Sequence, residues 1–201
     1  MFDNVTKMVK SIFYLNVLLF IVTVFFQSIG EYRFFESFAL YDIRNPMFQP
    51  WQLLTHMFMH GGLLHIAFNM WGLLTIGPLV ESYIGDRKFL IYYLISGIGG
   101  CLLHMFIMSS SVPMVGASGA LYGVAAIFAY IYPNEKLYLF FIPIGVKAKY
   151  LLPFVILIEF YCGFFMAVDG VAHLAHCGGA ATGLLLIALD KYLPKSITQY
   201  V

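Results

Sequence analysis

The chain has 201 residues, of which 61% are hydrophobic and only 10% are charged, whereas a soluble domain carries roughly a quarter charged residues. This composition excludes an ordinary soluble globular protein, and a formal net charge of +1 gives no basic surface for nucleic acid and no acidic surface for cationic partners. No charged residue occurs between Lys88 and Glu135. Because about 20 apolar residues cross a bilayer once, this stretch must cross it twice, and we expect an integral membrane protein.

Apolar runs separated by polar or helix-breaking residues predict six transmembrane helices in a single domain that covers residues 1–201. The runs are Ser11–Ile29, Leu63–Val80, Phe89–Met108, Ser118–Tyr132, Tyr150–Val168 and Ala172–Leu189. The first run ends in FQSIGEY without a small-residue cleavage site, which argues against a cleaved signal peptide. The predicted fold class is therefore an all-α membrane protein with six spans.

The lysines and arginines are divided unevenly between the two sides of this arrangement. Nine fall on one side: Lys7, Lys10, Arg87, Lys88, Lys136, Lys147, Lys149, Lys191 and Lys195. Only Arg33 and Arg44 fall on the other. Since cytoplasmic loops carry an excess of positive residues, both termini are expected in the cytoplasm. The second, fourth and sixth spans then begin at the outer side.

Polar residues concentrate in three segments near these outer ends, where burial is costly without a partner or a role. The segments are WQLLTHMFMHGGLLHIAFN before and within the second span, GASGALYG at the start of the fourth and AHLAHCGGAATG at the start of the sixth. All three lie at similar depth on the same side. They can therefore converge on one site although they are far apart in sequence.

The middle segment places one serine at the beginning of a helix. Ser118 is a weak nucleophile unless a base lies within hydrogen-bond reach, and histidine is the usual base. A helix start also offers free backbone N–H groups and the positive end of the helix dipole to a developing oxyanion. His65 and Asn69 are four residues apart and share a helix face, so both could donate to that oxyanion.

Two further features could hold such a site together. Tyr122 lies one turn after Ser118 on the same face, where its ring could orient a histidine of a neighbouring helix. Gly179 and Gly183 form a small-xxx-small pattern that allows another helix to approach closely. That contact would bring the sixth span, with His176, against the fourth.

Each feature also has a purely structural interpretation. Ser118 could simply cap its helix, and Gly119 and Gly123 could serve helix packing. His65 and Asn69 could form interhelical hydrogen bonds. The joint occurrence of the three segments at one depth is what favours a catalytic site.

Two other kinds of function compete with a serine nucleophile. His56 and His60 have the spacing of metal ligands, but an H-E-x-x-H pattern is missing and no carboxylate lies between them. They are expected to fix the loop to the following helix. A six-span transporter is the other alternative, against which the lack of repeated halves or paired broken helices argues.

In their order and placement, these motifs resemble those of the rhomboid intramembrane serine proteases. The matching features are the WQLLTHMFMH loop, H-x-x-x-N at His65 and Asn69, G-x-S-G from Gly116 to Gly119, and A-H-x-x-G-x-x-x-G from Ala175 to Gly183. The resemblance covers nearly the whole chain. It implies six spans with both termini inside and a short fourth span whose serine lies below the membrane surface in a water-filled cavity.

The resemblance also implies individual roles. Ser118 is then the nucleophile and His176 the general base. His65 and Asn69 stabilise the oxyanion, and Tyr122 supports the His176 ring.

The sixth span carries two histidines one turn apart, His173 and His176. In the family, glycines follow the catalytic histidine after three and seven residues. Gly179 and Gly183 satisfy this spacing from His176, whereas His173 would give His176 and Ala180. We therefore expect His176 to be the base and His173 to be a local partner or a water contact.

Three residues depart from the family pattern or lie near the expected site. Gln52 stands where some relatives carry Arg, and it is expected to change only how the loop is anchored. Glu159 lies in the middle of the fifth span, where an acid can be neutral, paired or facing a cavity, and Asp169 could be a minor helper. No acid accompanies Ser118 and His176 in a recognisable spacing, so the sequence predicts a Ser-His dyad rather than a triad.

The residues and the resemblance together predict an intramembrane serine endopeptidase that cleaves transmembrane segments of substrate proteins near their outward-facing end. No cofactor, metal or nucleic acid is expected, and the partners are transmembrane substrates and the lipid bilayer. Water is a reactant, so a polar cavity must open to the exterior. We expect a multi-pass protein of a bacterial inner membrane. A non-catalytic, substrate-binding relative is the alternative, against which Ser118 and His176 argue.

Overall fold

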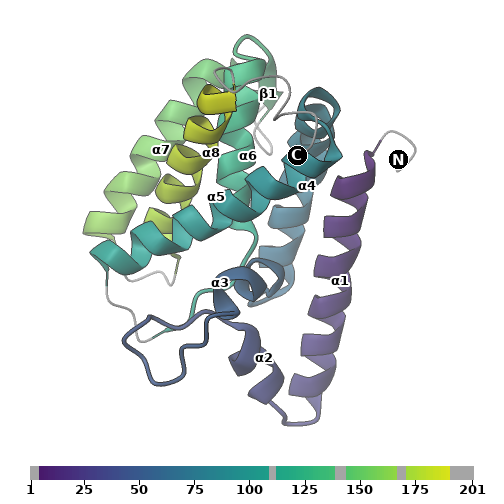
Figure 1. Ribbon diagram of the computed structural model, residues 1–201, viewed down its shortest axis with the longest axis vertical. Coiled ribbons are helices and arrows are strands. Elements are labelled where there is room, and N and C mark those ends of the chain that lie inside the picture. The colour runs from purple at the N-terminus through teal and green to yellow at the C-terminus, as the bar shows by residue number, and fades with distance from the viewer. Residues whose placement is uncertain (1–4, 109–111, 139–143, 167–170, 191–201) are drawn as a thin grey trace.

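The computed structural model describes residues 5–108, 112–138, 144–166 and 171–190. It is a bundle of helices that cross at differing angles, with one short β-hairpin (Figure 1). The long helices are α1 (Lys7–Ser28), α4 (Leu63–Ile84), α5 (Asp86–Ile107), α6 (Ser118–Ile131), α7 (Ala148–Phe165) and α8 (His173–Asp190). The short elements are α2 (Arg33–Phe38), α3 (Gln52–Thr55), the 3-10 helix η1 (His56–Phe58), β1 (Lys136–Tyr138) and β2 (Gly145–Lys147).

One long helix coincides with each of the six predicted apolar runs. The largest displacement of a start is in the first helix, which begins at Lys7 rather than Ser11. The fourth helix begins at the predicted residue, Ser118. Val168, the predicted end of the fifth run, lies outside the described residues, within which α7 ends at Phe165.

Among the described residues, four helices are long and apolar enough to cross a membrane: α1, α4, α5 and α7. The helix α6 is apolar but has only 14 residues. The helix α8 has 18 residues, among them His173, His176 and Asp190, and it is not one of these four. Length and composition thus support a membrane protein with four such helices. A count of six spans requires that α6 and α8 cross the membrane as well.

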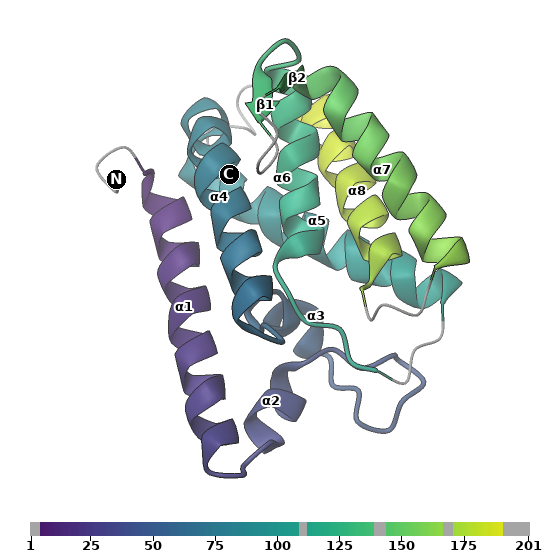
Figure 2. The ribbon, with the colours of Figure 1, turned by 180° about the vertical axis from the view of Figure 1, so that it is seen from behind.

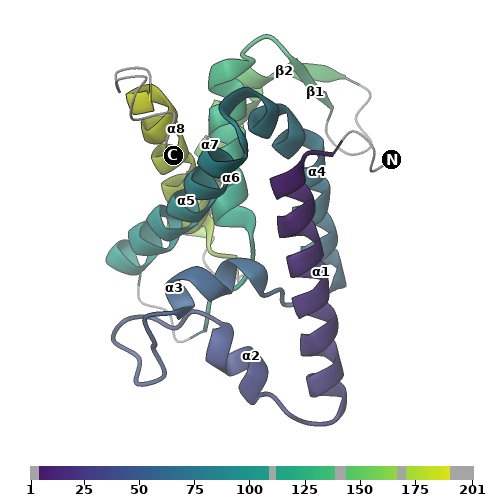
Figure 3. The same cartoon turned by 45° about the vertical axis from the view of Figure 1, so that its right-hand side comes forward.

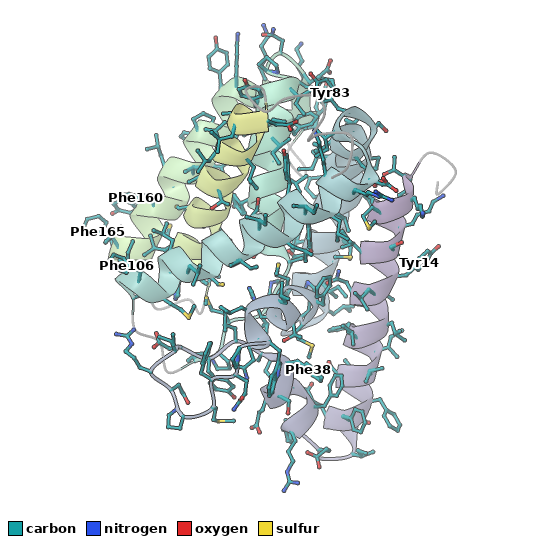
Figure 4. The ribbon with its side chains drawn as sticks, in the orientation of Figure 1. Tyr14, Phe38, Tyr83, Phe106, Phe160 and Phe165 are labelled. Carbon is teal, nitrogen blue, oxygen red and sulfur yellow. The ribbon has the colours of Figure 1, made fainter. Side chains whose placement is uncertain are left out.

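The surface of the bundle is rich in exposed aromatic side chains. Figure 4 shows Tyr14 on α1, Phe106 on α5, and Phe160 and Phe165 on α7 pointing away from the body of the molecule. Phe106 is 89% exposed and Phe165 is 73% exposed. A soluble protein rarely leaves a continuous apolar surface of this kind in water, whereas lipid accepts it.

The all-α prediction misses the β1–β2 hairpin, and the six predicted runs do not include the short helices α2 and α3. Strands β1 and β2 pair antiparallel, with Leu137 opposite Val146, and each has only three residues, too few to give a recognisable alternation of side chains. The short helices α2 and α3 lie in the long connection between α1 and α4. Figure 3 shows them at one end of the molecule, with the hairpin and the start of α1 at the other.

Helices α6 and α8 approach each other through glycines, and they lie side by side in Figures 1 and 2. A Cβ atom added at Gly179 would overlap the carbonyl oxygen of Gly119. One turn further on, a Cβ atom at Gly183 would overlap the backbone of Gly123 in the same way. Small residues are what allow helix backbones to come this close, so the two pairs set the separation of α6 and α8.

The neighbouring glycine, Gly178, faces a different helix. A Cβ atom there would lie 2.9 Å from the carbonyl oxygen of Gly99 and 2.8 Å from Cβ of Leu103, both on α5. Adjacent residues of a helix point about 100° apart, so consecutive glycines allow α8 to pack closely on α5 with one face and on α6 with another.

The start of α1 is tied to the end of α4 by a buried carboxylate. Glu81 accepts hydrogen bonds from the N–H groups of Met8, at 2.9 Å, and Val9, at 2.8 Å, and from the hydroxyl of Thr6. The first N–H groups of a helix lack acceptors within the helix, and a negative charge there is favourable to the helix dipole. Glu81 therefore fixes where α1 begins relative to the rest of the bundle.

The glycine contact of α8 with α6 gives the first prediction. Replacing Gly179 with Ala should lower the melting temperature measured in a fixed detergent, because overpacking of this kind costs roughly 1–3 kcal/mol and the clashing atom is backbone that cannot rotate away. Gly72→Ala is the matched control, since its Cβ would lie 4.0 Å from a flexible Leu121 side chain. Equal melting temperatures for the two variants would contradict the close α6–α8 contact.

Candidate active site

The serine and histidine predicted from the motifs lie within hydrogen-bond distance of each other. Ser118 is the first residue of α6, and His176 lies on the first turn of α8. The distance from Ser118 Oγ to His176 Nε2 is 2.7 Å. His176 is buried, so the pair is partly shielded from solvent.

A carboxylate fixes the tautomer of this histidine. Oε2 of Glu159, on α7, lies 2.9 Å from Nδ1 of His176. An ionised carboxylate only accepts hydrogen bonds, so Nδ1 carries the hydrogen and donates it to Glu159. Nε2 of the neutral ring is then a free acceptor, and the hydroxyl of Ser118 donates to it.

Glu159 is itself held by two other side chains. Nδ1 of His173 donates to the same Oε2 at 2.6 Å, and the hydroxyl of Tyr122 donates to Oε1. The Tyr122 ring also stacks on the ring of His176, with centroids 4.4 Å apart and planes 9° from parallel. Residues of α6, α7 and α8 thus fix both the plane of the imidazole and the direction of its N–H.

The ring of His65 can lie close to Gly116 and Ser118 because Gly116 has no side chain. Gly116 has a φ of +121°, a region that disfavours other residues. A Cβ atom there would lie 2.6 Å from His65 Nε2 and 3.8 Å from Ser118 Oγ. The N–H of Gly116 donates to the carbonyl of His56 at 2.9 Å. Gly116 therefore allows the His65 ring to sit beside the serine.

Asn69 is buried one turn after His65 on α4. Its side-chain Nδ2 donates to the carbonyl of His65 at 2.8 Å, which uses one of its two N–H groups. The amide carries a second N–H group, which this hydrogen bond does not use.

The capping interpretation of Ser118 does not fit its contacts. The residue at the N-cap position of α6 is Ala117, and no side chain caps the helix there. The hydroxyl of Ser118 instead bonds His176. The first N–H groups of α6 have no acceptor within the helix, so they are able to bind an anionic oxygen beside this hydroxyl.

Gln52 and His56 belong to the loop rather than to this cluster. The buried Gln52 side chain accepts from the N–H of Gln49 at 3.1 Å and donates to the carbonyl of Met47 at 3.1 Å. His56 Nδ1 bonds the carbonyl of Gln52 at 2.9 Å. Burial lowers the pKa of His56 to about 4 and that of the nearby His60 to about 3, so both rings are neutral at pH 7.

From the sequence, Glu159 is expected to be neutral, paired or facing a cavity, and His173 to be a local partner or a water contact. A dyad is predicted because no acid accompanies Ser118 and His176 in a recognisable spacing. The structure places Glu159 against both histidines. Glu159 precedes His173 by 14 residues and His176 by 17, a separation with no motif to recognise. An isolated acid within an apolar span was the available signal. Asp169, the acid named as a helper, lies outside the described residues.

By donor type, Glu159, His173 and His176 could also hold a metal ion, since their ligand atoms lie within 4.8 Å of one another. However, the two nitrogens lie 2.6 and 2.9 Å from the shared oxygen. Ligands of a tetrahedral zinc with bonds of about 2.0–2.1 Å are separated by about 3.3 Å. The observed spacing is that of charge-assisted hydrogen bonds.

Comparison with known proteins identifies a family. A family model described as the Rhomboid domain matches residues 47–192. RHOMBOID-like protein 4 of Arabidopsis thaliana is 35% identical over 139 residues, covering 69% of this chain and 33% of that protein. Rhomboid protease GluP of Bacillus subtilis is 33% identical over 147 residues, covering 73% of this chain and 27% of the relative.

A fungal relative, Rhomboid-type serine protease 2 of Emericella nidulans, is 30% identical over 160 residues, which are 76% of this chain and 29% of its own length. The chain thus spans about a third or less of the length of these three relatives. A mitochondrial yeast protein, Rhomboid protein 1, is also similar, at 28% identity, so membership supports a membrane protein without selecting a bacterial membrane. Because the Rhomboid model covers more than half of the chain, the protein belongs to the rhomboid family.

Proposed function

We propose that the chain is an intramembrane serine endopeptidase with Ser118 as its nucleophile and His176 as its general base. The observation that carries this proposal is the 2.7 Å contact between Ser118 Oγ and His176 Nε2 at the start of α6. Two relatives are named as proteases, which supports the same chemistry here. A hydroxyl bonded to an oriented imidazole is the arrangement that activates serine.

In the proposed reaction, Ser118 Oγ attacks the carbonyl carbon of the substrate peptide bond while His176 Nε2 takes the hydroxyl proton. The same nitrogen then gives this proton to the leaving amine, so the peptide C–N bond breaks and an acyl-enzyme remains. Water, deprotonated by His176, then attacks the ester. The ester C–O bond breaks, His176 gives the proton to Ser118 Oγ, and the carboxylic acid leaves. The N–H groups at the start of α6, with His65 and Asn69, stabilise the oxyanion of each tetrahedral intermediate.

The proposal includes six membrane spans with both termini in the cytoplasm. The starts of α1, α5 and α7 lie at the same end of the molecule as the hairpin (Figures 1 and 3). These segments carry Lys7, Arg87, Lys149 and, in the hairpin, Lys136 and Lys147. An excess of positive residues is typical of the cytoplasmic side. Lys191 and Lys195 lie outside the described residues.

The opposite end of the molecule is then external, and Arg33 begins the short helix α2 there. Ser118 begins α6 at the end away from the hairpin. The substrates are therefore transmembrane segments, cut near their outward-facing end. We propose a bacterial inner membrane as the location; one of the relatives is bacterial.

The second prediction tests the nucleophile and base. A serine-directed fluorophosphonate should label the purified wild-type protein, whereas Ser118→Ala and His176→Ala should lose both labelling and cleavage of a transmembrane substrate. The double variant should be no worse than either single one, because these groups act as a unit. His173→Ala is the matched histidine control and should lose less activity than His176→Ala.

Melting temperatures of the variants, measured in the same detergent, separate chemistry from unfolding. Normal turnover by a folded Ser118→Ala protein would disprove the nucleophile. A larger loss in His173→Ala than in His176→Ala would reassign the base.

The third prediction concerns the oxyanion. His65→Ala should reduce kcat with little change in KM, because the interaction forms only in the transition state; removing one such donor typically costs ~10²–10³-fold in rate. Asn69→Ala should lose less, since one Asn69 N–H group already bonds the His65 carbonyl. Steady-state kinetics on one fluorogenic transmembrane substrate would measure both, and losses confined to KM would indicate substrate binding instead.

A further inference from the structure

We propose that Glu159 is a positioning residue for the His176 base, so that the site works as a Ser-His-Glu arrangement rather than as a dyad. This inference rests on the proposed function and adds to it a residue that none of the family motifs contains. Glu159 would hold the Nδ1–H tautomer of His176 and stabilise the imidazolium that forms when Nε2 takes the serine proton.

The contacts place the imidazole between a hydroxyl and a carboxylate. His176 Nε2 lies 2.7 Å from Ser118 Oγ, and Nδ1 of the same ring lies 2.9 Å from Glu159 Oε2. A carboxylate in this position favours the tautomer in which Nε2 is the acceptor, and the opposite tautomer could not take a proton from Ser118. The geometry therefore links Glu159 to the reacting oxygen through one ring.

The carboxylate is held so that it cannot easily rotate away. Oε1 accepts the Tyr122 hydroxyl, and Oε2 is shared between His173 Nδ1, at 2.6 Å, and His176 Nδ1. The Glu159 side chain is 13% exposed and the two histidines 11% and 10%. Three donors in a poorly solvated site offset much of the cost of keeping a carboxylate there.

A purely structural role is the alternative, because the same bonds attach α7 to α6 and α8. The buried residues of α7 are Ala148, Leu151 and Gly163, so its apolar packing is limited and a polar anchor would be useful. Anchoring requires hydrogen bonds, but it does not require the negative charge. The two roles can therefore be separated by a variant that keeps the side-chain shape and removes the charge.

Glu159→Gln is that variant. If Glu159 positions and stabilises His176, kcat should fall by up to roughly 10⁴-fold, the loss seen when a Ser-His-Asp triad loses its acid, with KM changed little. The acidic limb of the pH profile of kcat/KM should also move to lower pH. Without the negative charge the protonated imidazole is less favoured, so the neutral, active base persists to lower pH.

Glu81→Gln provides the matched control, because Glu81 is a second buried carboxylate with three hydrogen-bond donors, at the start of α1 and outside the active site. It should lower the melting temperature and leave the position of the acidic limb unchanged. Glu159→Asp restores the charge on a shorter side chain, so it should recover part of the lost kcat and return the acidic limb toward that of the wild type.

Tyr122→Phe keeps the ring stacked on His176 and removes only the hydroxyl that bonds Glu159. It should lose less activity than Glu159→Gln, because the bond from His176 to the carboxylate is retained. All variants are compared with Ser118→Ala as the inactive reference, using the full chain in one detergent.

The outcomes distinguish the two levels of the proposal. Wild-type activity that is lost in Ser118→Ala but kept in Glu159→Gln, with an unmoved acidic limb, would overturn the role of Glu159 and leave the serine mechanism standing. A fall in kcat without a shift of the limb, not recovered in Glu159→Asp, would show an anchoring role only. A wild-type protein that neither cleaves nor reacts with the fluorophosphonate would overturn both. If Glu159→Gln fails to fold, Glu159→Asp decides, because its shorter side chain moves the carboxylate away from His176 Nδ1. A kcat and an acidic limb that both equal those of the wild type would then contradict a positioned carboxylate.

Discussion

The separation of α6 and α8 is the constraint on which the candidate site depends. The helices touch backbone to backbone where Gly179 meets Gly119 and where Gly183 meets Gly123. Ser118 directly precedes the first of these contacts on one helix, and His176 lies three residues before it on the other. Any side chain at the contact would push the two backbones apart and lengthen the 2.7 Å bond between Ser118 and His176. The requirement for glycine at these positions is therefore also a requirement of the proposed chemistry.

Helix α7, the third helix of the site, is held in place differently from α6 and α8. Helix α8 is packed on α5 as well as on α6 through its consecutive glycines, whereas α7 has few buried residues and an outer face of exposed aromatics. Polar contacts from Glu159 to Tyr122, His173 and His176 connect α7 to the rest of the site. The position of α7 and the orientation of the His176 ring are thus linked by one carboxylate. Close packing of α8 on α6 fixes the distance between His176 and Ser118. The hydrogen bond to Glu159 fixes the orientation of the His176 ring.

The sequence predicts those parts of the structure that local patterns determine. Apolar runs located all six long helices. The glycine spacing of the family that the chain resembles, applied to Gly179 and Gly183, selected His176 rather than His173, and His176 is the histidine that contacts Ser118. The sequence did not reveal the partner of Glu159, because that contact depends on how α7 is rotated about its axis. An apolar helix in lipid shows no hydrophobic face from which such a rotation could be read. The hairpin was missed for a different reason, since strands of three residues are too short to show a recognisable alternation of side chains.

The arrangement of charge around the site explains why a carboxylate is tolerated at Glu159 within an apolar helix. In the proposed reaction, a proton moves from Ser118 to His176, which leaves negative charge on the substrate oxygen and positive charge on the imidazole. The start of α6 presents the positive end of a helix dipole to the oxygen, and Glu159 presents a negative group to the far nitrogen of the ring. Each developing charge therefore has a fixed opposite charge beside it before the reaction begins, in a medium where water cannot easily reorganise to supply one. The cost of burying Glu159 is met in the ground state by three hydrogen-bond donors, and its charge becomes most favourable when His176 is protonated.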